Sequence, residues 1–336
     1  MERIASVGNI EKAVGEALRK RRKHNALTRD AVLFLKDRVR NVALIRESLL
    51  SGNMPEMKYK SFIRHEHGKK RRIDWNPSFR DNVVQHAIVR VLGPLLVAKM
   101  IPDTYSGIKG RGPSYGLVRL RRHVRKFDGR PLYILKIDIR QFYASVDTRM
   151  LKATVRRFIK DKALLRVLDH IIDSHPNGLP IGNYISQMLA NLYLTGLDRM
   201  LEARGLVVMR YCDDIVMMSD DKNALWGALL AIKSFLACSG LSVKPDLQMH
   251  PVECDGVDFM GFVVERRSVR LRKRIERSFR SASLKFSRNP SVKAYASLAA
   301  YNGWTQAVSR GGLLWKRVVG RPLKQCLGLA REAECA

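Results

Sequence analysis

Long apolar runs are missing from this sequence, and its cysteines show no pairing. No uninterrupted apolar stretch approaches the ~20 residues of a membrane-spanning helix, and residues 1–20 lack the apolar core of a signal peptide. The cysteines are odd in number and lack metal-ligand spacing: Cys212, Cys238, Cys254, Cys326 and Cys335. We therefore expect a reduced, cytoplasmic setting rather than a disulfide-bonded secreted protein.

Motifs of several other protein classes are absent as well. The Gly-rich stretch Tyr105–Tyr115 lacks the Lys-Ser/Thr ending of a phosphate-binding loop, which argues against a P-loop NTPase. The histidines do not recur at metal-ligand spacing, and the chain contains no internal repeat or low-complexity tract. The mixture of apolar and polar residues is that of a globular protein, but the net charge is unusual.

Acidic residues are scarce. The 336 residues include 31 Asp and Glu but 62 Lys and Arg, which gives a formal net charge of +31. An imbalance of this size predicts a polyanionic partner, and nucleic acid is the class that fits; the alternative is a solvated charged surface. The hydrophobic content of 46% makes a real core feasible and excludes global disorder.

The apolar and basic residues divide the chain into three expected regions. Residues 1–52 have helical spacing and predict an N-terminal helical extension, whose basic run Arg19–Lys23 is either a solvated face or a nucleic-acid contact. Residues 53–264 mix strand and helix patterns. Residues 265–336 predict a basic helical subdomain that grips nucleic acid, with dense cations at Arg270, Arg272, Lys273 and Arg274.

Within the central region we expect a succession of strands and helices. The expected strands are Ser61–Glu66 and Lys69–Trp75 with a turn at His67–Gly68, Leu132–Ile139, Val207–Arg210, Ile215–Met218, Leu241–Lys244 and the β stretch Gly256–Val264. Pro77–Ser78 opens a helix that Gly93–Pro94 breaks or kinks, and Pro180 leads into an apolar helix ending near Leu201.

Two positions in these elements carry chemistry. Asp213 and Asp214 are adjacent at the tip of a buried hairpin, and Asp138 ends a separate apolar strand. Buried neighbouring carboxylates repel each other and lose hydration, so a cation should compensate them. If the three converge, they can hold two Mg²⁺ ions, which suits phosphoryl transfer to a 3′-hydroxyl.

Lys70 and Arg72 lie on the return strand of the first hairpin and share a face. A basic hairpin of this kind can clamp a triphosphate or a template backbone. The alternative is protection of an exposed strand edge by charge.

These residues resemble the reverse transcriptases of bacterial diversity-generating retroelements over roughly Lys58–Val264. The resemblance rests on ordered motifs: Lys69–Ile73 with Arg80–Asp81, Tyr105–Gly110, Asp138–Tyr143, Ile181–Gln187 in its Ile-Gly-x-x-x-Ser-Gln form, Tyr211–Asp214, Leu241–Lys244 and Phe259–Phe262. It implies an α+β right-hand polymerase, with fingers and palm in residues 53–264 and a basic helical thumb in residues 265–336. It also implies error-prone copying of a template RNA into cDNA for mutagenic retrohoming.

The resemblance also implies roles for single residues. Asp138, Asp213 and Asp214 would be catalytic and would hold two Mg²⁺ ions, with the Ile139 carbonyl near a metal. Tyr143 would block a ribose 2′-hydroxyl, although it could instead be a core aromatic. The other implied contacts are Lys70, Arg72, Ile181 and Gln187 with the nucleotide, and Lys244, Phe259, Met260 and Gly261 with nucleic acid.

Ile181 stands where related enzymes place Gln, and a branched alkyl group cannot make that hydrogen bond. The resemblance ties this change to low fidelity opposite adenine; the alternative is simple packing. The resemblance further implies these partners: template RNA and its cDNA, a structured RNA, and a small basic helical accessory protein that forms oligomers. No nuclease or RNase H extension is expected after the thumb.

Two rival functions stay open. One is a reverse transcriptase of an antiphage defence system or a retron, which shares the chemistry. The Ile-Gly-x-x-x-Ser-Gln stretch argues against a retron more firmly than against a defence enzyme. The other is a non-catalytic RNA-binding scaffold, against which the intact Asp138, Asp213 and Asp214 speak.

Overall fold

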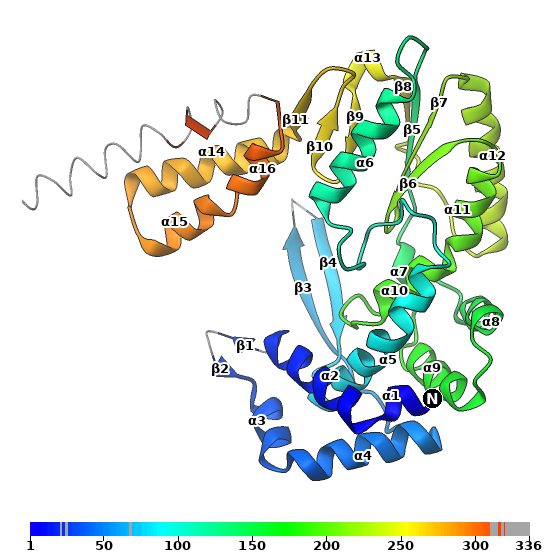
Figure 1. The fold of residues 1–336 in the computed structure, drawn as a ribbon, viewed down its shortest axis with the longest axis vertical. Coiled ribbons are helices and arrows are strands. Elements are labelled where there is room, and N and C mark those ends of the chain that lie inside the picture. Colours follow the sequence, from blue (N-terminus) through cyan, green and yellow to red (C-terminus); the bar gives the residue numbers. More distant parts are fainter. Residues whose placement is uncertain (21, 24–25, 67–68, 310–314, 317–318, 320–336) are drawn as a thin grey trace, which may run out of the picture. The chain divides into compact units, whose positions relative to one another are not determined.

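The computed structural model describes residues 1–20, 22–23, 26–66, 69–309, 315–316 and 319. These residues form two compact units, and the chain passes between them more than once. Figure 1 shows their helices and strands, coloured along the sequence. The first unit holds Met1–Lys109, Lys136–Ile215 and Trp226–Leu247, and the second holds Gly110–Leu135, Val216–Leu225 and the chain from Gln248 on. The turn expected at His67–Gly68 lies outside the described residues. So does the part of the expected thumb beyond residue 309, except for residues 315–316 and 319. The region boundaries expected at residues 52 and 264 stay predictions.

The N-terminal part of the first unit is helical, as its spacing predicts. It contains α1 (Glu2–Ala5), α2 (Val7–Lys20), α3 (Arg29–Lys36) and α4 (Arg38–Ser51), with the short strands β1 (Arg22–Lys23) and β2 (Ala26–Leu27). Ile10, Val14 and Ala17 recur about once per turn on α2 and are fully buried, because this face of α2 packs against α5 (Phe79–Val97). Gly52 ends α4 at φ 77°, and its amide donates to the Ser48 carbonyl.

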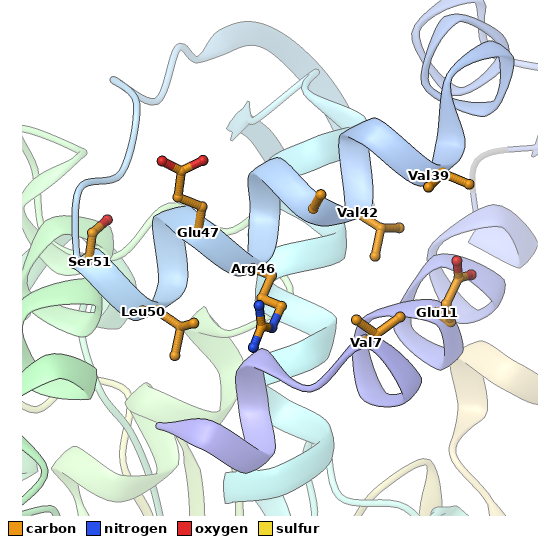
Figure 2. A pocket seen from close by; sticks show the side chains of 9 residues that line it. Val7, Glu11, Val39, Val42, Arg46, Glu47, Leu50 and Ser51 are labelled. Atoms are coloured by element: carbon orange, nitrogen blue, oxygen red, sulfur yellow. The ribbon is translucent and has the colours of Figure 1, made fainter.

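An apolar groove of about 550 Å³ opens between α2 and α4 (Figure 2). Val7 of α2 and Val42 of α4 lie toward each other across it. Val39 at one end is 83% exposed, so this groove leaves apolar surface open to solvent. The groove is also lined by Glu11 and Glu47.

The hairpin expected from the first basic motif is confirmed. Strands β3 (Lys60–Glu66) and β4 (Lys69–Trp75) pair antiparallel, with His65 opposite Lys70 and Ile63 opposite Arg72. The helix after it, α5, begins beyond Ser78, whose hydroxyl accepts from the Asp81 amide at 3.1 Å. The expected break at Gly93–Pro94 is wrong, because α5 runs through Pro94 to Val97, and a kink there stays a prediction.

The remaining elements of the first unit are helices and the first of the two strands expected beside the Asp pair. They are α7 (Phe142–Ser145), α8 (Thr148–Phe158), α9 (Lys162–Asp173), α10 (Ser186–Tyr193), α11 (Thr195–Glu202), β6 (Val207–Tyr211) and most of α12 (Lys222–Cys238). Strands β5 (Tyr133–Asp138) and β7 (Asp214–Ser219) belong to both units. The sheet order is β6-β7-β5-β8, where β8 is Gln248–Pro251.

Two expectations for this region need correction. The single apolar helix expected up to Leu201 is divided into α10 and α11 at Leu194, whose φ of −90° and ψ of 0° interrupt the helical ladder. The strand expected at Leu241–Lys244 is wrong, because only one isolated bridge forms there, between Ile139 and Val243. This segment lies beside the end of β5, where the Lys244 amide donates to the Asp138 carbonyl and the Arg140 amide donates to the Ser242 carbonyl, both at 2.8 Å.

The second unit combines α6 (Pro113–Arg125) with a small sheet and a helical segment. Its other elements are α13 (Val252–Asp255), β9 (Val257–Phe259), β10 (Phe262–Val264), β11 (Val269–Leu271), α14 (Lys273–Arg288), α15 (Val292–Ala299) and α16 (Asn302–Gln306). The strands pair antiparallel in the order β11-β10-β9. Phe279 of α14 is fully buried and stacks on Trp315 at 5.7 Å. Helices and antiparallel strands thus make up both units, so the α+β class is confirmed.

Candidate catalytic site

The site is built on the tight turn that joins β6 to β7. Cys212 has a left-handed backbone with φ 61°, which is unfavourable for a residue with a side chain. Asp213 follows it and Asp214 begins β7. The amide of Ile139, just past the end of β5, donates to the Asp213 carbonyl at 3.2 Å. The end of β5, with Asp138, therefore lies directly beside the turn that carries the Asp pair.

Burial and mutual repulsion make the carboxylate of Asp213 costly to ionise. Removal from water raises the pKa of Asp213, and the neighbouring charge of Asp138 raises it further. Lysines partly offset this concentration of negative charge. Lys244 Nζ lies 2.5 Å from Asp138 Oδ1, and Lys136 Nζ lies 3.3 Å from Asp214 Oδ2.

Asp138, Asp213 and Asp214 would offer only carboxylate oxygens, which are the ligands that hard divalent cations prefer. Within the described part of the chain, however, no group of three or more His, Cys, Asp or Glu side chains stands in a metal-holding arrangement. Two of the carboxylates instead contact Lys136 and Lys244. The strand ends meet as expected, but metal binding at Asp138, Asp213, Asp214 and the Ile139 carbonyl stays a prediction.

The side chain of Tyr143 reaches this turn from α7. Cys212 Sγ donates to the Tyr143 hydroxyl at 3.4 Å. Burial, followed by the neighbouring Cys212, raises the pKa of Tyr143, so its hydroxyl stays protonated. Burial likewise raises the pKa of the Cys212 thiol to about 11, which fits a packed residue rather than a nucleophile. Tyr143 is thus tied to the turn that carries the Asp pair.

The Ile181–Gln187 segment lies between the first hairpin and the loop before α6. The Gly182 amide donates to the Asp74 carbonyl at 3.0 Å, and a Cβ on Gly182 would lie 2.5 Å from that of Trp75, so only glycine fits. A Cβ on Gly107 would lie 2.2 Å from Gln187 Cγ, so the Gly107 backbone packs directly on the Gln187 side chain. Ile181 is 48% exposed, so its side chain is not a core residue.

The cations expected to meet the triphosphate are exposed on β4. Arg72 Nε lies 3.0 Å from Asp74 Oδ1, and Arg72 also donates to the Ser61 hydroxyl. The Arg72 side chain is 72% exposed. Lys70 is exposed as well. Their contact with a nucleotide stays a prediction.

The residues beyond Asp214 that we expect to contact nucleic acid, apart from Lys244, belong to the second unit. Phe259 is 1% exposed, and the turn after it has left-handed backbone at Met260 (φ 49°) and Gly261 (φ 91°). A Cβ on Gly261 would lie 2.6 Å from Ile275 and 2.7 Å from Trp304. The cations of this region divide into two kinds: Arg270 and Arg272 pair with Glu265 and Asp258, whereas Lys273 and Arg274 are exposed.

Sequence reasoning missed the buried residues that support the turn. Arg210 forms hydrogen bonds to Asp198 and Asn191, and all three side chains are buried beside the turn. Lys136 was also missed, although it lies two residues before Asp138 on the same strand face. The available signal for Arg210 was a lone cation within the apolar run from Val207 to Met218.

Comparison with known proteins identifies the family. The family model for reverse transcriptase (RNA-dependent DNA polymerase) matches residues 63–264, more than half of the 336-residue chain. Protein YkfC of Escherichia coli (strain K12) is 25% identical over 175 residues, which are 48% of this chain and 46% of YkfC. The chain thus spans about half the length of this curated relative.

Solved telomerase structures have a similar fold. Apo telomerase from Candida tropicalis gives a TM-score of 0.53 at 12% identity over 88% of this chain and 63% of that chain. Telomerase from Candida albicans, solved in complex with a TWJ fragment of telomeric RNA, gives 0.50 at 11% identity over 85% and 61%. These likenesses show the fold, and the expected right-hand polymerase class is confirmed. With its central 63–264 segment matched, the chain belongs to the reverse transcriptase (RNA-dependent DNA polymerase) family.

Proposed function

We propose that this chain is an RNA-directed DNA polymerase that copies a template RNA into cDNA. The observation that carries the proposal is the bond from the Ile139 amide to the Asp213 carbonyl at 3.2 Å, which brings Asp138 beside the Asp213–Asp214 pair. This meeting of strand ends falls inside the segment that matches the family. The formal charge of +31 supports a nucleic-acid substrate.

Nucleotidyl transfer needs positioning and charge neutralisation more than covalent chemistry. Two divalent ions, held by Asp138, Asp213, Asp214 and the Ile139 carbonyl, would lower the pKa of the primer 3′-hydroxyl and stabilise the leaving pyrophosphate. Lys136 and Lys244 neutralise two of the carboxylates and would move from them when cations bind. Lys70 and Arg72 would contact the triphosphate, and the Tyr143 ring would lie against the sugar.

Primer extension tests the proposal. The wild-type chain with poly(rA)/oligo(dT), dTTP and Mg²⁺ is expected to extend the primer, and Asp213→Ala is expected to give no signal. Equal signal from both proteins, or none from either, would favour the RNA-binding scaffold. No helix among the described residues has the length and hydropathy to cross a bilayer, and a cytoplasmic location is part of the proposal.

The finer part of the proposal is a diversity-generating role, with error-prone cDNA used for mutagenic retrohoming. The Ile181–Gln187 motif supports it over a retron enzyme. The alternative of an antiphage defence enzyme shares the same chemistry, so genomic neighbours discriminate between them. An accessory gene with paired near-identical repeats that differ at adenines supports mutagenic retrohoming, whereas a defence island supports the alternative.

The proposed partners are template RNA with its cDNA, a structured RNA and a small helical accessory protein that forms oligomers. The Candida albicans telomerase structure contains an RNA fragment, which supports RNA as the partner of this fold. A basic accessory protein would need an apolar or acidic surface. The groove between α2 and α4 offers an apolar one, since Val7 and Val42 line it, whereas Glu11 is paired with Arg38 and Arg46 also lines the groove. Sequencing of co-purified RNA would identify the template.

Replacing Ile181 by glutamine is expected to lower misincorporation opposite template adenine roughly 5- to 100-fold, because one orienting hydrogen bond is restored. Ile181 is 48% exposed, so the change should not destabilise the protein. Sequencing of cDNA made on a defined RNA measures the error spectrum. The matched control is Ile181→Val, which keeps a branched alkyl group and should keep the wild-type errors. An unchanged spectrum in Ile181→Gln refutes the role.

A further inference from the structure

Arg210 is a charged side chain that lies entirely within the protein, two residues before Cys212. It is 0% exposed, and so is its partner Asp198 on α11. Arg210 Nε lies 2.8 and 3.0 Å from the two oxygens of Asp198, and Nη2 lies 2.6 Å from Oδ2. Because a buried charge without its partner is strongly destabilising, each residue fixes the other in place.

The same guanidinium also donates to the catalytic turn. Arg210 Nη1 lies 3.2 Å from the Cys212 carbonyl oxygen, which belongs to the peptide that joins Cys212 to Asp213. On the other side of Asp213, the Ile139 amide holds the Asp213 carbonyl at 3.2 Å. The peptides before and after Asp213 are therefore both held by hydrogen bonds from other parts of the chain. This matters because Cys212, at φ 61°, has a backbone conformation that it would not prefer by itself.

Arg210 joins this turn to the surrounding elements. Its Nη1 donates to Asn191 Oδ1 at 3.1 Å, and Asn191 Nδ2 donates to the Ser106 carbonyl at 2.6 Å. The backbone of Arg210 pairs with the same loop, since the Tyr105 amide donates to its carbonyl at 3.0 Å. One buried cation therefore connects α10, α11, the loop around Ser106 and the turn of the Asp pair.

We propose that Arg210, held by Asp198, is a positioning residue for DNA synthesis: its bond to the Cys212 carbonyl keeps the peptide before Asp213 oriented so that Asp213 stays beside Asp138. The inference rests on the proposed polymerase function. A packed apolar pair at these positions would stabilise the core at least as well as a buried ion pair. Stability alone therefore does not account for the charges, whereas the directed hydrogen bond to the turn does.

The test uses the double variant Arg210→Met/Asp198→Leu in the full chain. It removes both charges together, so no unpaired charge stays buried, and its melting temperature is expected within a few degrees of wild type. Its kcat for primer extension is expected to fall about 100-fold, as a small misplacement of a reacting group does. The KM for dTTP should change less than about threefold, since the nucleotide contacts are untouched.

The matched control is Leu197→Ala, a fully buried neighbour of Asp198 on α11. It is expected to lower the melting temperature but to keep kcat when assayed well below that temperature. If the double variant does not fold, Arg210→Lys replaces it. Lysine keeps a positive charge beside Asp198 but lacks the planar guanidinium, whose N–H groups reach Asn191 and the Cys212 carbonyl. The kcat should therefore fall about tenfold.

Amide hydrogen exchange at Ile139 provides a readout independent of catalysis. Its amide is protected by the bond to Asp213, and faster exchange is expected in the double variant. Faster Ile139 exchange in the double variant, combined with no polymerase activity in the wild-type chain, would sink the proposed function but keep the positioning of the turn by Arg210. Wild-type kcat together with unchanged Ile139 exchange in the folded double variant would overturn the inference.

Discussion

Asp213→Asn is expected to abolish DNA synthesis and, in EDTA, to raise the melting temperature of the protein. Asn keeps the shape of Asp but removes the charge that would bind a cation, so we expect a loss of at least about a thousandfold in primer extension. The pKa of Asp213 is raised by burial first and by Asp138 second, so the ionised form is destabilising in the metal-free fold. Removing it should raise the melting temperature by roughly 2–4 °C.

Differential scanning fluorimetry in EDTA and primer extension in Mg²⁺ measure the two effects on the same preparation. The control is Asp161→Ala, which removes the cap of α9 that accepts from the Leu164 amide at 2.9 Å. It should lower the melting temperature and leave synthesis intact. A fall in stability together with retained synthesis in Asp213→Asn would contradict both the electrostatic account and the catalytic role.

Tyr143→Val is expected to admit ribonucleotides. The Tyr143 ring reaches the catalytic turn, where its hydroxyl accepts from Cys212 Sγ at 3.4 Å, so the ring is held where it could block a 2′-hydroxyl. Removing it should raise the efficiency of rNTP relative to dNTP incorporation by about 10- to 100-fold. Single-nucleotide extension with UTP and dTTP on poly(rA) measures the ratio.

The matched control for this prediction is Tyr143→Phe, which keeps the ring and loses only the bond to Cys212. Its sugar selectivity should stay near wild type, because the exclusion is steric. If Tyr143→Val retains full selectivity as well, Tyr143 is a packing residue of the turn and the gate lies elsewhere.

The hairpins could be predicted from local pattern. Strand-like segments on both sides of His67–Gly68 predicted the pairing of β3 with β4, and the apolar runs beside Asp213 and Asp214 predicted β6 and β7. The predictions failed where the secondary structure of a segment depends on residues that are distant in the sequence. Leu241–Lys244 has the composition of a strand, but its backbone bonds reach the end of β5 at Asp138 and Arg140, and only a single bridge forms, at Val243.

The sequence by itself determined which side chains could do the chemistry, because an acidic residue after an apolar strand has to lie at that strand's end. It therefore located Asp138 and the Asp213–Asp214 pair at strand ends, and it established the basic character of the protein. Only the tertiary structure decided what holds and neutralises them. Lys244 contacts Asp138 across 106 positions of the chain, and Arg210 binds Asp198 on a different element, 12 positions away. Such pairs depend on how helices and strands pack, and no local spacing encodes that packing.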